Sequence, residues 1–370
     1  MARRLSAGDL AVSDAAADDG DSSQRESSVE QRFSRYERQW RYAPIGLAGQ
    51  QRLRQSRVLL IGCGALGSVA AELLVRAGVG SLRIVDRDFL EWNNLQRQSL
   101  YTEEDVRRGW PKAVTAAERL AAINHEVSIE PIVADATWER IGPWFESVDV
   151  VIDGTDNFET RFLINDASCQ TGIPWVFAGC LGAEGQSMTI VPGVTPCLRC
   201  LMPDGPPAAG ESPTCDSAGI LGTIIHVMAS IQVTEALKWI VGDRDAIQPR
   251  LSVIDLWTSG LRSLDLGKLP REACPTCAGG ERLWLSGERA SQSVVLCGRN
   301  SVQVSLPTAP DLDTLPSRIA SARVLVSNAF LVRLRVEDHE LTVFRDGRVI
   351  VSGETDPAAA RSLVARHLGM

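Results

Sequence analysis

The sequence lacks the features of a secreted, membrane or nucleic-acid-binding protein. Its 370 residues carry a formal net charge of −8, so no basic surface for DNA, RNA or anionic lipid is expected. No apolar run approaches the roughly 18–20 residues of a membrane helix. The opening Met1-Ala2-Arg3-Arg4 is basic but no apolar stretch follows it, so we expect no signal peptide. A reducing cytoplasm is the expected compartment.

Histidine is scarce, and the cysteines do not suggest a disulfide framework. The 4 histidines are scattered and form no metal-ligand pattern. The 9 cysteines are an odd number in a chain long enough to be stabilised by a buried core. Metal binding or thiol chemistry therefore explains them better than disulfide pairing.

Alternating strand and helix patterns predict an α/β fold over about residues 30–280. Residues 58–61 form a continuous apolar run suited to a strand buried on both faces, and glycines and a helical stretch follow. Such alternation indicates a mainly parallel sheet. Residues 1–30, rich in Ala, Ser and acidic side chains, are predicted to be a disordered tail. The further strands are expected over 82–85, 127–133, 148–152, 173–178 and 186–191, with helices over 32–53, from Pro111, and over 220–241.

After Cys277 the pattern changes to short strands, which predicts a second, smaller domain. Asp346-Gly347 between two of these strands predicts a hairpin turn. We take residues 285–370 as an appended α+β domain of unknown role. The candidate strands are 294–304, 324–326, 331–336, 341–344 and 349–351, and the candidate helices are 311–322 and 357–368.

A glycine-rich loop follows the first buried strand. Gly62, Gly64 and Gly67 form a GxGxxG pattern between that strand and a helix, a context in which backbone N–H groups cradle phosphate. Asp86 ends the next strand and is placed to accept hydrogen bonds from ribose hydroxyls. The pattern fits NAD as well as ATP, and a tight turn of purely structural purpose also produces it.

Charged and amide side chains near the expected strand ends favour ATP. The chain carries Asp88, Asn94, Arg97, Lys112 and Asp156 at such positions. Hydride transfer has little use for so many fixed charges, whereas nucleotidyl transfer needs cations on the triphosphate and a carboxylate for Mg²⁺. Each residue alone is typical of a solvated surface, but together they indicate a nucleotidyltransferase.

With these motifs in this order, the chain resembles the MoeB and ThiF adenylyltransferases, the prokaryotic relatives of ubiquitin-activating enzymes. The resemblance covers about residues 35–280, and with the N-terminal tail set aside it assigns residues 31–284 to an adenylation domain. The motifs that carry it are Arg35-Tyr36-Glu37-Arg38-Gln39, the glycine loop, Ala77-Gly78-Val79-Gly80, Asp86-Arg87-Asp88, Asn94-Leu95-Gln96-Arg97-Gln98, Pro111-Lys112, Asp153-Gly154-Thr155-Asp156-Asn157, Glu184-Gly185-Gln186 and Cys197-Leu198-Arg199-Cys200.

The resemblance implies a role for each motif residue. Asp86 would bind the ribose, while Arg97 and Lys112 would contact the phosphates. Asp156 would organise Mg²⁺ and the triphosphate, and Asp88 and Asn94 would line the same site. Arg38 matches an arginine that the family supplies from the partner protomer, which implies a homodimer.

The resemblance also implies the reaction. The C-terminal Gly-Gly carboxylate of a ubiquitin-like sulfur-carrier protein would attack ATP, giving an acyl-adenylate for molybdopterin, thiamine or related sulfur incorporation. Such catalysis is mainly charge neutralisation and positioning. Activation of a small or tRNA-borne carboxylate, an NAD-dependent oxidoreductase and a non-catalytic carrier-binding module are the alternatives.

Two CxxC pairs, Cys197 with Cys200 and Cys274 with Cys277, have the number and spacing of a structural zinc site. Redox pairs or free thiols are the alternative, and matching pairs in the family bind zinc.

Cys215 precedes a helix in a loop rich in Pro and Gly over 202–219, where a lowered thiol pKa favours a nucleophile. It matches a family cysteine that some members use for acyl or sulfur transfer, and a partly exposed thiol is the plainer interpretation.

The remaining cysteines are expected to be packing residues, because Cys63, Cys169 and Cys180 lie in apolar contexts. Cys297 is a weaker candidate for sulfur handling in the appended domain. Some relatives carry a C-terminal rhodanese domain, but residues 285–370 are too short for one and lack its cysteine loop. A separate sulfur donor is therefore expected.

Overall fold

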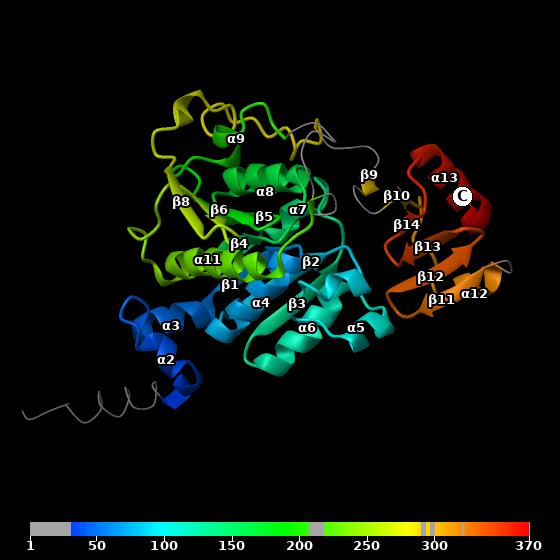
Figure 1. The fold of residues 1–370 in the computed structure, drawn as a ribbon, viewed down its shortest axis with the longest axis horizontal. Helices are drawn as coiled ribbons and strands as arrows, with labels where there is room; N and C mark the ends of the chain where they lie inside the picture. Colours follow the sequence, from blue (N-terminus) through cyan, green and yellow to red (C-terminus); the bar gives the residue numbers. More distant parts are fainter. Residues whose placement is uncertain (1–30, 207–217, 290–293, 297–299, 320–321, 370) are drawn as a thin grey trace, which may run out of the picture.

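The computed structural model describes residues 31–206, 218–289, 294–296, 300–319 and 322–369, with backbone alone at 294–296 and 369. Within these residues it contains a large mixed sheet with helices on both faces and a separate, smaller antiparallel sheet (Figure 1). The α/β fold class with a small α+β part is confirmed. The tail predicted over 1–30 lies outside the described residues.

The larger sheet has the strand order β3-β2-β1-β4-β5-β6-β7-β8. The pairs among β1 to β5 are parallel, and β6, β7 and β8 are antiparallel to their neighbours. The strands are β1 (Arg57–Ile61), β2 (Ser81–Asp86), β3 (Ser128–Val133), β4 (Val150–Asp153), β5 (Trp175–Leu181), β6 (Glu184–Ile190), β7 (Arg250–Asp255) and β8 (Gly260–Asp265). Neither β7 nor β8 was expected from the sequence, and β8 is an exposed edge strand with no buried face to impose an apolar pattern.

The larger sheet has a hydrophobic core on each face, and side chains of the central strand β1 enter both. Successive side chains of a strand point to opposite faces, so Leu60 joins one buried cluster and Leu59 the other. The cluster around Leu60 includes residues of α4, α6 and α11, and the cluster around Leu59 includes residues of α7 and α8. The run at 58–61 is therefore apolar throughout because helices cover both of its faces.

The helices of this part connect the strands and cover the sheet (Figure 1). They are α4 (Ala65–Ala77), α5 (Glu103–Arg108), α6 (Lys112–Ile123), α7 (Ile141–Trp144), α8 (Phe158–Thr171), α9 (Leu198–Leu201) and α11 (Gly222–Val241), with 3-10 turns η2 (Trp92–Asn94) and η3 (Arg271–Ala273). The region 32–53, expected to be one helix with an arm, is instead η1 (Ser34–Tyr36), α2 (Glu37–Trp40) and α3 (Gly46–Gln55).

Helix α11 is 20 residues long and, with a mean hydropathy of 1.3, apolar enough to cross a membrane by length and composition. The expectation that no segment approaches this length was wrong. The helix lies across β4, β5 and β6 and against α4, where Ile224, Met228 and Val233 are buried. Its apolar character is thus explained by packing in the interior of the fold.

The smaller sheet has the order β11-β12-β13-β14-β10-β9, and all its described pairs are antiparallel. Gly347, at a φ of +90°, turns the chain between β13 and β14, as the Asp-Gly signal predicted. The helix expected over 311–322 is only four residues long, and the run 294–304 forms two strands instead of one. The elements are β9 (Val294–Leu296), β10 (Ser301–Ser305), α12 (Leu315–Arg318), β11 (Arg323–Ser327), β12 (Leu331–Val336), β13 (His339–Phe344), β14 (Arg348–Ser352), α13 (Pro357–Val364) and the π-helical turn η4 (Ala365–Gly369).

The strand order of the larger sheet predicts a ligand-binding crevice beside β1. The chain passes from β1 outward to β2 and β3, then returns to β4 on the other side of β1. Ligands of open α/β sheets bind outside the carboxyl ends of the strands where the order reverses in this way. The glycine loop after β1 and the Asp153–Asp156 turn after β4 both lie at this point.

Candidate active site and metal centre

Three glycines fix the crevice where β1, α4 and β4 meet. A Cβ on Gly67 would lie 1.9 Å from the carbonyl oxygen of Gly62, and one on Gly154 would lie 2.1 Å from the same atom. Gly62 itself has a φ of +86°. The backbones therefore touch directly, and no other residue fits at Gly67 or Gly154.

Gly64 differs from these three because it faces open space. It is the N-cap of α4, and a Cβ there would meet only the Gln98 side chain, at 3.8 Å. The buried Oε1 of Gln98 has no hydrogen-bond partner among the described residues. The accessible helix N-terminus suits an anionic ligand, whereas the Gln98 oxygen is an acceptor that only a hydroxyl or N–H group of a ligand would satisfy.

Asp86, Asp88 and Lys112 lie together at the ends of β2 and α6. The Asp86 carboxylate accepts the backbone N–H of Cys63 at 2.6 Å and that of Asp88 at 2.7 Å. The backbone N–H of Lys112 donates to the Asp88 carbonyl at 2.8 Å, and Lys112 Nζ lies 3.4 Å from Asp88 Oδ2. The glycine loop, the acidic strand end and the lysine are thus one connected group.

Burial and charge set the electrostatics of this group. Burial raises the pKa of Asp86, and the neighbouring Asp88 adds to the rise while Lys112 opposes it. Burial alone would lower the pKa of Arg87, but the carboxylates of Asp135, Asp88 and Asp156 hold that pKa above its ordinary value. The crevice therefore contains a permanently charged guanidinium among three carboxylates.

The turn after β4 places Asp156 on the same edge of the sheet. Behind it, Arg161 Nε pairs with Asp153 Oδ2 at 3.1 Å, and Arg161 Nη2 donates to the Thr155 carbonyl at 2.8 Å. Asn157 then caps α8 by accepting the Thr160 N–H at 2.8 Å. Asp156 itself is exposed, so its carboxylate is accessible to a cation.

The segment after β2 contains Asn94 and Arg97. Asn94 is buried, and its side chain accepts the backbone N–H of Glu91 at 3.0 Å. The Arg97 guanidinium donates to the Asn93 carbonyl at 2.8 Å and remains partly exposed. Tyr101 OH donates to the Cys63 carbonyl at 2.8 Å, which joins this segment to the glycine loop.

Arg38 is far from this group within the chain. It lies on α2, where the adjacent Gln39 donates to the Ala77 carbonyl at the last residue of α4. The glycine loop is at the first residue of the same helix, whose 13 residues span about 20 Å. Arg38 is exposed at the amino-terminal edge of the sheet, opposite the other predicted residues.

The four predicted zinc ligands converge. The Sγ atoms of Cys197 and Cys274 are 3.7 Å apart, those of Cys197 and Cys200 3.8 Å, and those of Cys200 and Cys277 3.6 Å. A tetrahedral ion with Zn–S bonds of about 2.3 Å requires sulfur separations of about 3.8 Å. The donor set therefore fits zinc without rearrangement, although other ions with thiolate ligands share this geometry.

Helix α8 supports the cysteine cluster. The side chain of Asn165 accepts the Leu198 N–H at 2.8 Å, and that of Asp166 accepts the Trp284 N–H at 2.9 Å. Burial raises the pKa of Asp166 to about 6. Cys169, predicted to be a packing residue, packs in the same core as the cluster, and hydrogen bonds from Cys169 and Cys200 lower the pKa of Cys197 to about 7.

Of the other cysteines, Cys180 is partly buried against the core that contains Leu60, as expected of a packing residue. Cys63 is fully buried, and burial raises the pKa of its thiol to about 12, as suits a packing residue. Cys215 and Cys297 lie outside the described residues.

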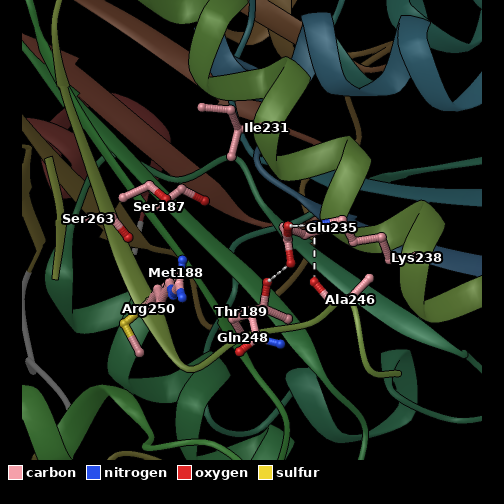
Figure 2. A pocket seen from close by; sticks show the side chains of 11 residues that line it. Ser187, Met188, Thr189, Ile231, Glu235, Lys238, Ala246, Gln248, Arg250 and Ser263 are labelled. Atoms are coloured by element: carbon pink, nitrogen blue, oxygen red, sulfur yellow. Dashed lines mark hydrogen bonds and ion pairs between the residues drawn. The ribbon is translucent and has the colours of Figure 1, made fainter. Parts of the chain in front are cut away.

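A cavity of about 210 Å³ lies between β6, β7 and α11 (Figure 2). Its wall includes Glu235, which accepts a hydrogen bond from Thr189 at 3.0 Å, and Lys238. None of the predicted site residues that the structure describes lines this cavity.

Comparison with known proteins decides the family. The profile of the ThiF family matches residues 36–276. The chain belongs to the ThiF family. It is 43% identical over 338 residues to the sulfur carrier protein ThiS adenylyltransferase of Bacillus subtilis, covering 90% of this chain and 99% of that protein.

Other ThiF relatives cover less of the chain. The ThiS adenylyltransferase of Escherichia coli is 38% identical over 67% of this chain and 96% of its own length. The SAMP-activating enzyme E1 of Haloferax volcanii is 38% identical over 67% of this chain and 90% of its own length. The crystal structure of E. coli MccB with ATP shares the fold, with a TM-score of 0.55 and 20% identity over 71% of this chain and 83% of that one.

Sequence reasoning about this ThiF chain missed Arg161, and it quoted Gly154 and Gln98 within motifs without giving them a role. Arg161 orders the turn before Asp156, Gly154 allows the close approach of β4, and Gln98 faces the glycine loop. Gly154 directly follows a strand, which is a usable signal for close backbone contact. Arg161 lies inside a helix, and its sequence alone does not distinguish it from a surface arginine.

Proposed function

We propose that this ThiF chain is an ATP-dependent adenylyltransferase that activates the C-terminal Gly-Gly carboxylate of a ubiquitin-like sulfur-carrier protein. The observation that carries the proposal is the grouping of Lys112, Asp88 and Asp86 beside the glycine loop, whose Cys63 N–H donates to Asp86. The names of the B. subtilis and E. coli relatives support a sulfur carrier as substrate. A small or tRNA-borne carboxylate is the alternative substrate.

In this proposal the chain binds ATP in the crevice and lowers the repulsion between two anions. Asp86 keeps acceptor capacity for ribose hydroxyls, because its two oxygens accept one backbone N–H each. Lys112 and Arg97 neutralise phosphate charge. A carboxylate oxygen of the carrier attacks the α-phosphorus, the bond from that phosphorus to the bridging oxygen breaks, and pyrophosphate leaves. No proton is transferred, because the carboxylate is already ionised near neutral pH.

Asp156 is the residue proposed to hold Mg²⁺, with Asp88 beside it. Their oxygen ligands suit a hard cation, and the exposed Asp156 carboxylate can reach one bound to the phosphates. The ion would neutralise charge on the phosphate oxygens. Arg161 holds the turn that carries Asp156 in place.

The cysteine cluster is proposed to hold a structural Zn²⁺. All four ligands come from the chain, which leaves no open position for catalysis. The ion would join α9 to the segment after β8. Four reduced thiols also favour a reducing cytoplasm as the compartment.

Two further roles depend on molecules outside the chain. Arg38 is proposed to act in the site of a partner protomer, since it lies about one helix length from its own glycine loop. Cys215 is proposed as a nucleophile for acyl or sulfur transfer with a separate sulfur donor, and a Cys215→Ser variant that keeps both adenylation and sulfur transfer would remove it from that role.

The test is to incubate the protein with MgATP and Gly-Gly-ended carriers and weigh the products by intact mass spectrometry. A carrier that gains the mass of one adenylyl group, with pyrophosphate released, is expected. The matched control is the same carrier without its last glycine. Adenylation of free small carboxylates with no carrier modified would overturn the proposed substrate.

A further inference from the structure

We propose that the smaller sheet braces the nucleotide site, with Arg348 and Gln303 as positioning residues for Asp88 and Lys112. The inference rests on the proposed function and gives a role to the appended part of the chain. The contacts of the smaller sheet with the larger part include two segments beside the site, residues 87–89 and 109–110. These segments flank Asp88 and precede Lys112.

The first contact is a buried arginine. Arg348 is 3% exposed, and its Nη1 donates to the Arg87 carbonyl at 3.0 Å. Its Nε pairs with Asp346 Oδ2 at 2.7 Å, and Asp346 also pairs with Arg140 at 3.2 Å. A buried guanidinium is stable only when its charge is paired, so this geometry is firmly held. The carbonyl it binds lies between Asp86 and Asp88.

The second contact passes through a carboxylate. Gln303 Nε2 on β10 donates to Asp135 Oδ2 at 3.1 Å. Arg87 Nη1 pairs with Asp135 Oδ1 at 3.2 Å. One amide of the smaller sheet thus orients the carboxylate that holds Arg87, while Arg348 binds the main chain of the same residue. Both the side chain and the backbone of Arg87 are fixed from the smaller sheet.

The third contact is apolar. Phe89 is buried in one cluster with Leu331, Phe344 and Ile350 of the smaller sheet. Its ring centroid lies 6.4 Å from that of Phe344, and the Arg333 guanidinium lies 3.8 Å from the Phe89 centroid. Because Phe89 directly follows Asp88, burying this ring limits how far Asp88 can move.

The fourth contact reaches the segment before Lys112. Asn328 Nδ2 donates to the Gly109 carbonyl at 3.3 Å, and the rings of Trp110 and Phe330 meet edge to face at 5.7 Å. The two braced segments are themselves joined, because Phe89 forms a β-bridge with Pro111. The smaller sheet therefore holds both sides of the Asp88–Lys112 pair at once.

The consequence is a specific effect on nucleotide binding. Loosening the brace would disturb where Asp88 and Lys112 meet the phosphates, because the substituted side chains contact the segments that carry these two residues. We expect full-length Arg348→Met and Gln303→Leu variants to bind MgATP about five- to thirtyfold more weakly by calorimetry, with the KM for ATP raised similarly. The KM for the carrier should stay unchanged, and Arg348→Lys should recover part of the loss.

The matched control is Arg366→Met, which removes an exposed ion pair with Glu337 in the part of the chain that contains the smaller sheet. It should bind MgATP as the wild type does. If Arg348→Met fails to fold, Gln303→Leu carries the test, because it removes one neutral amide. A folded variant that binds ATP as tightly as the control overturns the brace.

The two proposals fail separately. Calorimetric binding of MgATP needs no carrier and no turnover. A wild-type chain that binds ATP but adenylates no carrier would overturn the proposed function, and the variants' affinities would still decide the brace. An active enzyme whose brace variants keep wild-type ATP affinity would overturn the brace alone.

Discussion

Lys112 Nζ lies 3.4 Å from Asp88 Oδ2, and the two side chains are only 4% and 13% exposed. Lys112 is also the first residue of α6, where the helix dipole disfavours a cation. Asp88 offsets that cost, and a bound phosphate would offset it further. A shielded lysine at the positive end of a helix is a local conflict of the kind found at functional sites.

Removing this cation should stop the reaction. We expect Lys112→Ala to lower the rate of carrier-dependent ATP–pyrophosphate exchange by about a hundredfold or more, as loss of a preorganised charge typically does. Lys268→Ala is the matched control, because Lys268 is an exposed lysine in the segment after β8, outside the group formed by Asp86, Asp88 and Lys112. Near-wild-type exchange in a folded Lys112→Ala protein would contradict the assignment.

Asp156 should matter through Mg²⁺. We expect Asp156→Ala to lower exchange by about a hundredfold or more, and a higher Mg²⁺ concentration to recover part of the rate if the carboxylate acts as a ligand. Circular dichroism should show an intact fold, since Asp156 is exposed. The exposed Asp245→Ala is the control. Exchange that is insensitive to the loss of Asp156 would exclude it from the site.

Much of this site was predictable because it depends on local rules. Leu59 and Leu60 reveal a strand between two cores, and the glycine loop and Asp86 follow directly from strand ends. The contact of Arg348 with Arg87 was not predictable, since it joins residues 261 positions apart and leaves no periodic signal. The position of Arg38 was not predictable either. It is set by the contact between Gln39 and the last residue of α4, which forms only in the folded chain.

The metal centre should contain about one zinc per chain by elemental analysis. We expect Cys277→Ser to lose most of the zinc and to unfold more readily, because zinc binding contributes directly to folding free energy. Cys180→Ser is the control, since Cys180 packs against the other core and does not belong to the four converging thiols. Equal zinc loss in both variants would show that the assignment of four ligands is wrong.

Asp166 should make stability depend on pH. Its pKa is raised to about 6, so the folded state binds the proton more tightly than the unfolded chain does. The stabilising contribution of the protonated group is fully present below about pH 4 and is lost as the pH rises through 6. We expect the free energy of unfolding of Asp166→Asn, relative to wild type, to increase between pH 4.5 and 7. A difference that is flat with pH would contradict the raised pKa.

Arg38 should act across a dimer, and mixing two inactive variants tests this. If Arg38 serves the partner's site, a heterodimer of Arg38→Ala and Lys112→Ala chains has one complete site, made from Lys112 of the first chain and Arg38 of the second. Random exchange of subunits should then restore about a quarter of wild-type exchange activity. Mixing Lys112→Ala with Asp156→Ala is the control, because both residues belong to the same chain's crevice and every site stays defective. Recovery in neither mixture, with subunit exchange verified, would show that Arg38 does not act in the partner's site.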